Sequence, residues 1–179
     1  MINDVKEVLF NEEELKGKVN ELGRKISEDY KGKDLIVVGV LKGSVIFAAD
    51  LFRSITIPCE LDFMAVSSYG DSTESSGVVR ILKDLDHNIE GKDILIVEDI
   101  VDSGITLKYL LKYLAARKAN TIEIATLLNK EARRVADIDV KYVGFEVPDE
   151  FIVGYGIDYA QKYRNLPFVA TLKPEVYKK

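Results

Sequence analysis

One segment, residues 94–106, constrains the fold of this chain more than any other. It reads ILIVEDIVDSGIT, and its first four residues form an unbroken apolar run. Such a run is typical of a parallel strand that is buried on both faces between layers of helices. Glu98 and Asp99 follow at the point where we expect that strand to end. Because open α/β sheets bind ligands beyond the carboxyl ends of their strands, the segment predicts both an α/β fold and the position of its site.

Small and hydroxyl-bearing residues follow the two acids and lead into a helical pattern, LKYLLKYLAARK. We expect a tight loop whose free N–H groups, helped by the helix dipole, hold a phosphate. This loop contains Asp102, Ser103, Gly104, Ile105 and Thr106. The two acids would repel a phosphate unless the ligand also carries hydroxyls, as a ribose 5-phosphate does; they could then accept the hydroxyl protons or hold Mg²⁺. The plain alternative is that Asp102 or Ser103 caps the helix, and the residues alone leave both interpretations open.

A second apolar run, residues 35–40, ends in a loop that carries Lys42, Gly43 and Ser44. A helical pattern follows over residues 45–55, and a strand, a short Lys-Gly-Ser loop and a helix can together form an anion site. The order of residues differs from the Walker A motif, and GxGxxG is absent. Lys42 alone would suit a solvated loop lysine better than an anion site.

The remaining patterns complete a doubly wound sheet in a single domain, residues 1–179. We expect strands over residues 60–67, 122–128 and 142–147, a hairpin strand within 78–84, and helices over 13–30 and 107–118. Residues 67–77, SSYGDSTESSG, form the one long loop of low hydrophobicity, which is either plain surface or a lid that excludes water.

Composition narrows the class of protein. The net charge of −5 and a pI near 5.1 argue against a general nucleic-acid surface, so an anionic substrate must meet local cations. No apolar run is long enough for a membrane helix and the start is no signal peptide, which favours a cytoplasmic protein. Cys59 is the single cysteine, expected as a small core residue, and His87 is expected on the surface.

The stretch VEDIVDSGIT resembles the phosphoribosyl pyrophosphate signature of the type I phosphoribosyltransferases: four hydrophobics, two acids, then Asp and [ST]-G-x-T. The resemblance implies their α/β fold, with a central, mainly parallel sheet flanked by helices and a small hood formed largely by the N-terminal and C-terminal segments. It also implies a set of residues that bind phosphoribosyl pyrophosphate: Glu98, Asp99, Asp102, Ser103, Gly104, Ile105, Thr106, Lys42, Gly43 and Arg164. In this family the peptide that matches Leu41-Lys42 is often cis, and the dipeptide that matches Ser68-Tyr69 belongs to a mobile active-site loop.

The C-terminal block VGFEVPDEFIVGYGIDYAQKYRNLPF resembles the corresponding part of the hypoxanthine-guanine phosphoribosyltransferases. That resemblance implies that Phe151 stacks on the purine, that Ile152 reads it through backbone groups and that Lys130 donates to its 6-oxo group. Asp158 would serve base recognition and, with Glu98 and Asp99, the metal shell. Taken singly, Phe151 and Ile152 would suit a core and Arg164 a surface.

The implied reaction joins a 6-oxopurine to phosphoribosyl pyrophosphate with Mg²⁺, giving a nucleoside monophosphate and pyrophosphate. Asp102 would be catalytic, accepting or orienting the purine N7 proton. The partners would be these small molecules, with no nucleic acid or membrane, and the family implies a homodimer or homotetramer. Two alternatives are a regulator of the same fold that binds nucleotides and RNA, and an adenine- or orotate-specific relative. The acidic pI and the base-reading block disfavour the first, and Lys130 with the Phe151 block disfavours the second.

Overall fold

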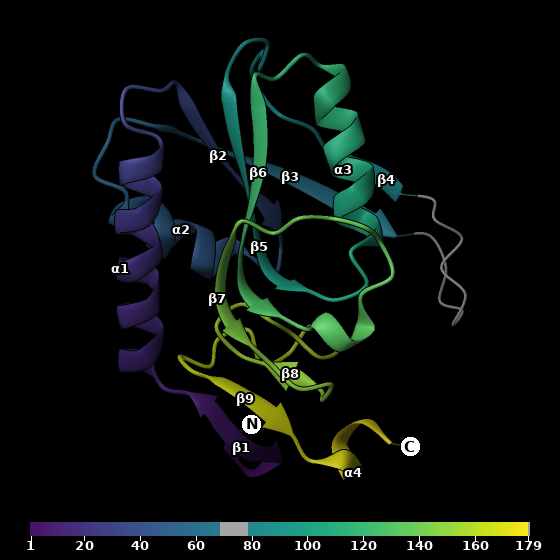
Figure 1. Cartoon of the computed structure of the whole chain (residues 1–179). Coiled ribbons are helices and arrows are strands. Elements are labelled where there is room, and N and C mark those ends of the chain that lie inside the picture. The colour runs from purple at the N-terminus through teal and green to yellow at the C-terminus, as the bar shows by residue number, and fades with distance from the viewer. Residues whose placement is uncertain (69–78, 179) are drawn as a thin grey trace.

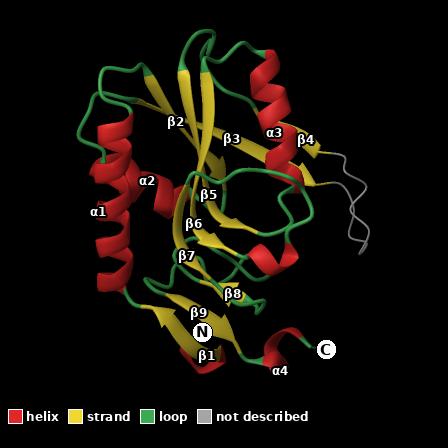
Figure 2. Ribbon diagram, in the orientation of Figure 1, coloured by secondary structure: helices red, strands yellow, loops and turns green. Residues whose placement is uncertain are grey.

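The structure is a computed structural model that describes residues 1–68 and 79–178. Tyr69, one member of the expected loop dipeptide, lies outside the described residues. Figures 1 and 2 show the arrangement of the elements. Their bounds along the chain are η1 Ile2–Asp4, β1 Val5–Phe10, α1 Glu12–Asp29, β2 Leu35–Leu41, α2 Val45–Ser54, β3 Glu60–Ser68, β4 Val79–Lys83, β5 Asp93–Val101, α3 Ile105–Ala116, β6 Thr121–Asn129, η2 Glu131–Arg133, β7 Tyr142–Glu146, β8 Ile152–Val153, β9 Val169–Leu172 and α4 Pro174–Tyr177.

The main sheet has the strand order β4-β3-β2-β5-β6-β7 and is parallel except for the β3–β4 pair. Alternate residues of its central strands enter two separate cores. Leu35 and Val37 pack in the core that contains α1 and α2, whereas Ile36 and Val38 pack in the core that contains α3. Helices therefore cover both faces of the sheet (Figure 1), which confirms the predicted α/β class and the buried parallel strands.

Strand β5 corrects one sequence-based expectation. We expected Glu98 and Asp99 just beyond its end, but the strand runs on through Val101. Glu98 pairs with Thr126, and Ile100 pairs with Leu128, because β6 is long enough to continue the ladder alongside. The two acids therefore lie near the end of strand β5 rather than on a loop.

The other predicted helices and strands lie within two residues of their observed bounds. The hairpin prediction is also confirmed, since β4 pairs antiparallel with β3. His87 is exposed as expected, whereas Cys59 is only partly buried and packs against the edge of a core. Within the described ranges, no helix combines the length and the apolar character needed to cross a membrane.

A second, three-stranded sheet with the order β1-β9-β8 lies beside the carboxyl edge of the main sheet (Figure 2). It joins the two ends of the chain, because β1 pairs antiparallel with β9. Asn11, which follows β1, begins α1 with a capping box: its side chain accepts from Glu14 N–H, and the Glu14 carboxylate accepts from Asn11 N–H at 2.8 Å. This cap fixes where the small sheet ends and the main fold begins.

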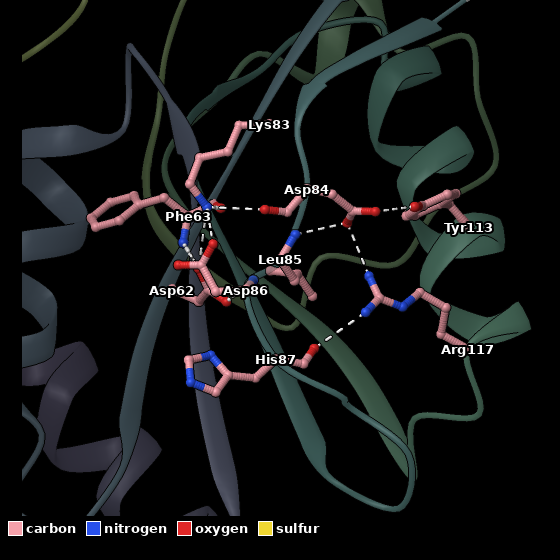
Figure 3. Close-up of polar contacts among 9 residues, drawn as sticks. All are labelled: Asp62, Phe63, Lys83, Asp84, Leu85, Asp86, His87, Tyr113 and Arg117. Atoms are coloured by element: carbon pink, nitrogen blue, oxygen red, sulfur yellow. Dashed lines mark hydrogen bonds and ion pairs between the residues drawn. The ribbon is translucent and has the colours of Figure 1, made fainter.

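A polar cluster fastens the β4 end of the sheet to α3 (Figure 3). The Asp84 carboxylate accepts from the Tyr113 hydroxyl and from Arg117 Nη1 at 2.9 Å, and Arg117 Nη2 donates to the His87 carbonyl at 3.2 Å. Partial burial acts to raise the pKa of Asp84, but these donors and the following N–H lower it overall. The cluster thus secures the far end of the helix whose start carries the phosphate-loop candidates.

Candidate functional site

Three segments interlock at the carboxyl edge of the main sheet, around Asp99 on β5. A Cβ atom at Gly43 would overlap the Asp99 carboxylate, and a Cβ atom at Gly156 would overlap the Gly43 carbonyl. Only glycine at both positions allows the β2 loop, the β5 acid and the loop after β8 to approach this closely. The predicted residues Gly43 and Asp99 are therefore brought together.

Arg164 lies on the same side and is held by three groups. Its Nη1 donates to the Gly156 carbonyl at 2.8 Å, its Nη2 donates to Gln161 Oε1 at 3.2 Å, and its Nη2 pairs with Asp158 Oδ1 at 3.1 Å. The Arg164 charge acts to lower the pKa of Asp99 and the Asp158 charge acts to raise it, so both groups are electrostatic neighbours of the β5 acids. One fixed cation and three carboxylates thus share this part of the site.

The two β5 acids are set in an environment that disfavours their charge. Burial, followed by the charge of Asp99, raises the pKa of Glu98 well above its ordinary value. Burial also raises the pKa of Asp99, to about 6, although the N–H of Ile100 donates to Asp99 Oδ1 at 2.7 Å. Two adjacent carboxylates held in this way are matched to a ligand that supplies positive charge or hydroxyl protons.

Whether the site could hold a metal ion depends on how its carboxylates are arranged. Among the described residues, no group of three or more His, Cys, Asp and Glu side chains is arranged to hold a metal ion, so Glu98, Asp99 and Asp158 form no closed site. Mg²⁺ is commonly held by one or two carboxylates together with substrate oxygens and water. The donor set of Glu98 and Asp99 fits that open mode of binding.

The loop between β5 and α3 is short and tightly shaped. Gly104 has φ of 80° and precedes the helix, so Ile105 and Thr106 belong to the first helical turn rather than to the loop. Within residues 1–68 and 79–178, no side chain caps the helix at Gly104; Ser103 Oγ accepts only a long hydrogen bond, of 3.4 Å, from Ile105 N–H. Asp102 Oδ1 is buried and has no hydrogen-bond partner among the described residues. The helix-cap interpretation of Asp102 therefore finds no contact in the structure.

Arg134 is a residue of this loop region that was not predicted as part of the site. Its Nε donates to the Asp102 carbonyl at 3.2 Å, and its Nη2 donates to Asn129 Oδ1. A Cβ atom at Gly104 would lie 3.2 Å from Arg134 Cδ, so the arginine also packs against the turn. The only sequence signal for this residue was its place as the second of two adjacent arginines shortly after a strand. The sequence does not indicate which backbone carbonyl its side chain binds.

A pocket of about 450 Å³ opens between this loop, the end of β6 and the small sheet. Four of the predicted residues line it, namely Asp102, Lys130, Phe151 and Ile152. The other lining residues, which were not predicted, are Lys6, Ile100, Arg133, Asp149, Glu150, Ile157 and Tyr177. The pocket therefore joins the predicted catalytic acid to the predicted base-binding residues.

Lys130 is buried at the wall of this pocket, with 8% of its surface exposed. Its Nζ donates to the Glu150 carbonyl at 3.0 Å and lies 3.9 Å from Asp149 Oδ1. Asp149 in turn pairs with Arg133 Nε at 2.6 Å. The ammonium group is thus held in a defined direction and keeps a further donor for a ligand.

Phe151 and Ile152 behave differently from each other. Phe151 is 47% exposed, which excludes the core position that its residue type alone would suit, whereas Ile152 is 6% exposed and does belong to a core. Ile152 pairs with Thr171 of β9, and the Phe151 carbonyl accepts from Leu172 N–H at 3.0 Å. The small sheet therefore presents the Phe151 ring at the pocket from a fixed backbone.

The other predicted residues that the structure describes do not line this pocket, and Lys42, Asp158 and Ser68 are among them. Lys42 is exposed in the β2 loop, and its peptide with Leu41 is cis. Asp158 accompanies Arg164 and does not line the pocket. Ser68 is the last residue of β3. A larger groove of about 950 Å³ between α1 and α2 reaches Arg164 but contains no other predicted site residue.

Comparisons with known proteins agree with this geometry. Residues 6–160 match the family described as the phosphoribosyl transferase domain. The chain is 55% identical over 177 residues to the hypoxanthine-guanine phosphoribosyltransferase of Staphylococcus aureus, covering 99% of each chain. It is also 55% identical over 177 residues to that of Bacillus subtilis, covering 99% of this chain and 98% of the relative. A crystal structure of a hypoxanthine phosphoribosyltransferase from Staphylococcus aureus superimposes with a TM-score of 0.98 at 54% identity, covering 100% of this chain and 97% of the other.

Proposed function

We infer that this chain, which belongs to the phosphoribosyl transferase domain family, transfers the 5-phosphoribosyl group of phosphoribosyl pyrophosphate to hypoxanthine or guanine. The products are IMP or GMP and pyrophosphate, a reaction of purine salvage. One observation carries the proposal: Asp102, Lys130 and Phe151 line a single pocket next to the Asp99–Gly43 contact. A base site and a sugar-phosphate site would thus be adjacent.

The reaction breaks the bond between ribose C1 and the pyrophosphate oxygen and forms a bond from C1 to a purine nitrogen. Its transition state has cationic sugar character, so the protein must neutralise the leaving group and position the base. We assign the first task to Arg164, Lys42 and the backbone of the β2 loop. Loop 102–106 and the start of α3 would hold the 5-phosphate.

Mg²⁺, when bound, would neutralise charge on the pyrophosphate. Glu98 and Asp99 are the residues that would hold it together with the ribose hydroxyls, and Asp158 would contribute from beside Arg164. Their raised pKa values are consistent with this role, because a cation or a set of hydroxyl donors would offset the charge that burial disfavours.

The base-binding residues follow from the pocket. Phe151 would stack on the purine, Ile152 would contribute backbone groups, and Lys130 would donate to the 6-oxo oxygen. Asp102 would act on the N7 proton, since its buried Oδ1 lacks a partner within the described structure. We also propose small-molecule partners alone, a cytoplasmic location and a homodimer or homotetramer, all of which rest on the family. Ser68, the last residue of β3, would contribute to the active-site segment that the family implies.

A direct assay tests the function. Purified protein with Mg²⁺, phosphoribosyl pyrophosphate and hypoxanthine or guanine should release pyrophosphate and form IMP or GMP in equal amounts. The same mixture with orotate should yield no nucleotide. Formation of orotidylate, or no nucleotide from either 6-oxopurine, would refute the proposal; RNA binding without turnover would favour the regulator.

The acidic pair on β5 provides a prediction about stability and activity together. The pKa of Asp99 is raised to about 6 in the folded protein, whereas the unfolded carboxyl ionises near its ordinary value of about 4. Between these values the folded state holds protons that the unfolded chain releases, so stability falls as the pH rises through that window. Replacing both residues, Glu98→Gln with Asp99→Asn, should therefore stabilise the protein without Mg²⁺ at pH 7.5 by about 1–3 kcal/mol, after allowance for partial exposure.

The measurements are thermal unfolding at pH 4 and pH 7.5 and the kinetics of phosphoribosyl pyrophosphate. The double variant should show a smaller loss of Tm between these pH values and a lower kcat/KM for phosphoribosyl pyrophosphate. Glu90→Gln, at an exposed acid that lies 3.9 Å from Lys118, is the matched control and should change neither. An unchanged kcat/KM in the double variant would remove the pair from the substrate site.

A further inference from the structure

Three aromatic rings gather at the outer side of the base pocket, and only one of them has a role in the proposed function. The ring centroids of Phe151 and Tyr177 are 4.1 Å apart with a tilt of 32° between their planes. The Tyr159 ring meets Phe151 edge-on, with centroids 5.8 Å apart and planes at 82°. Tyr177 comes from α4, the short C-terminal helix that follows β9 (Figure 1).

These contacts leave part of the Phe151 ring free. The Tyr177 ring packs against one face of the Phe151 ring, and the Tyr159 ring stands nearly perpendicular to it. Phe151 is nevertheless 47% exposed, and it lines the pocket together with Ile100 and Lys130. The exposed part of the Phe151 ring is therefore available to a planar base, and Tyr177, which also lines the pocket, packs against the ring from another side.

Tyr177 is part of the fixed structure and not a loose plug in the pocket. It is partly buried and packs against a hydrophobic cluster of the small sheet that includes Val153 and Leu172. Its short helix begins with Pro174, whose carbonyl accepts from Lys178 N–H at 2.8 Å. The hydrogen bond from Leu172 N–H to the Phe151 carbonyl ties the same strand to the stacking residue.

We propose that Tyr177 is a positioning residue for the purine, which braces Phe151 from behind and holds its ring in the orientation that stacks on the base. The inference rests on the proposed function and extends the base site to the C-terminal helix. Offset aromatic pairs stabilise one relative orientation of the rings. Without the brace, the exposed Phe151 ring has more orientations to lose when the base binds, and this cost falls on base affinity alone.

A competing arrangement predicts the opposite result. If Tyr177 instead occupied the place of the base and had to leave before binding, its removal would tighten binding and lower the KM for hypoxanthine. The sign of the change in KM therefore separates a brace from an obstacle. A merely structural role would raise the KM values for both substrates together or lower stability only.

The test compares Tyr177→Leu, which removes the ring, with Tyr177→Phe, which keeps it. KM is measured for hypoxanthine at saturating phosphoribosyl pyrophosphate and then with the roles reversed. The expected result for Tyr177→Leu is a rise of about three- to tenfold in KM for hypoxanthine, the equivalent of one aromatic pair, with KM for phosphoribosyl pyrophosphate unchanged. Tyr177→Phe and the exposed control Glu175→Gln on the same helix should match the wild type.

Thermal unfolding accompanies each variant, and Tyr177→Met, whose longer and more flexible side chain can adapt to the space left by the ring, replaces the leucine variant if that one does not fold. An unchanged or lowered KM for hypoxanthine in a folded variant would overturn the inference while the proposed function stands. Equal rises in both KM values would overturn it as well. A wild type that forms no nucleotide would instead remove the proposed function, and the inference with it.

Discussion

Adenine is expected to be used on the order of 10⁴-fold less efficiently than hypoxanthine, because Lys130 offers only donors to the 6-position of the base. The 6-oxo oxygen of hypoxanthine accepts a hydrogen bond, whereas the 6-amino group of adenine presents another donor. The Lys130 side chain cannot move away from a mismatched base, because it is buried and its Nζ donates to the Glu150 carbonyl at 3.0 Å. Sites built in this way reject an analogue strongly because the buried polar group is left without its partner.

Replacing Lys130 with glutamine should lower activity on hypoxanthine and narrow the gap to adenine, because the amide can present either a donor or an acceptor. The measurement is kcat/KM for hypoxanthine, guanine and adenine in the wild type and in Lys130→Gln. Lys141→Gln is the control. It removes the same charge from an exposed lysine just before β7, outside the base pocket, and should leave the base preference intact. Comparable wild-type rates on adenine and hypoxanthine would defeat the 6-oxopurine assignment. An unchanged preference in Lys130→Gln would place that lysine outside the base site.

The central sheet could be predicted from the sequence because its strands are buried on both faces and therefore read as unbroken apolar runs. Val37 and Val38 point into different cores, so neither position tolerates a polar side chain. The small sheet carries no such signal. Strand β1 is largely exposed, and β8 has only two residues, Ile152 and Val153, so pairing with β9 rather than local sequence fixes both.

The residues of the candidate site also differ in whether the sequence could predict them. Residues such as Asp99 and Lys130 could be predicted as site residues because they follow an apolar run. Ligands of open α/β sheets bind beyond the carboxyl ends of the parallel strands. Arg134 and Tyr177 give no comparable signal, since each acts through a contact that the chain makes only after folding. Glu98 and Asp99 were predicted as site residues but placed past the strand end, because an apolar-to-polar boundary does not reveal that β6 continues the ladder beside them.

Asp102→Asn is the second large effect that we expect, a fall in kcat of about 10²- to 10⁴-fold if Asp102 moves or orients the purine N7 proton. Asparagine keeps the shape of the side chain but cannot accept a proton on nitrogen, and its amide would point a donor where the base also presents one. The loop itself should not move, because Arg134 holds the Asp102 backbone carbonyl and not the carboxylate. The loss should therefore appear in kcat for hypoxanthine and guanine alike, with little change in Tm.

A loss of kcat without a loss of Tm separates a catalytic role from a helix-capping role. A cap residue stabilises its helix, and replacing such an Asp with alanine costs about 0.5–2 kcal/mol. Within the described residues, Asp102 Oδ1 is buried without a partner, and α3 follows its N-cap Gly104 with no side-chain cap. Removing an unsatisfied buried oxygen costs little stability, so Asp102→Ala should unfold near the wild-type temperature while it loses activity. The measurements are kcat under saturating substrates and Tm for both variants. A fall in kcat of less than about threefold, or a clear loss of Tm in Asp102→Ala, would return Asp102 to the role of a structural residue and leave the N7 proton to solvent or to another group in the pocket.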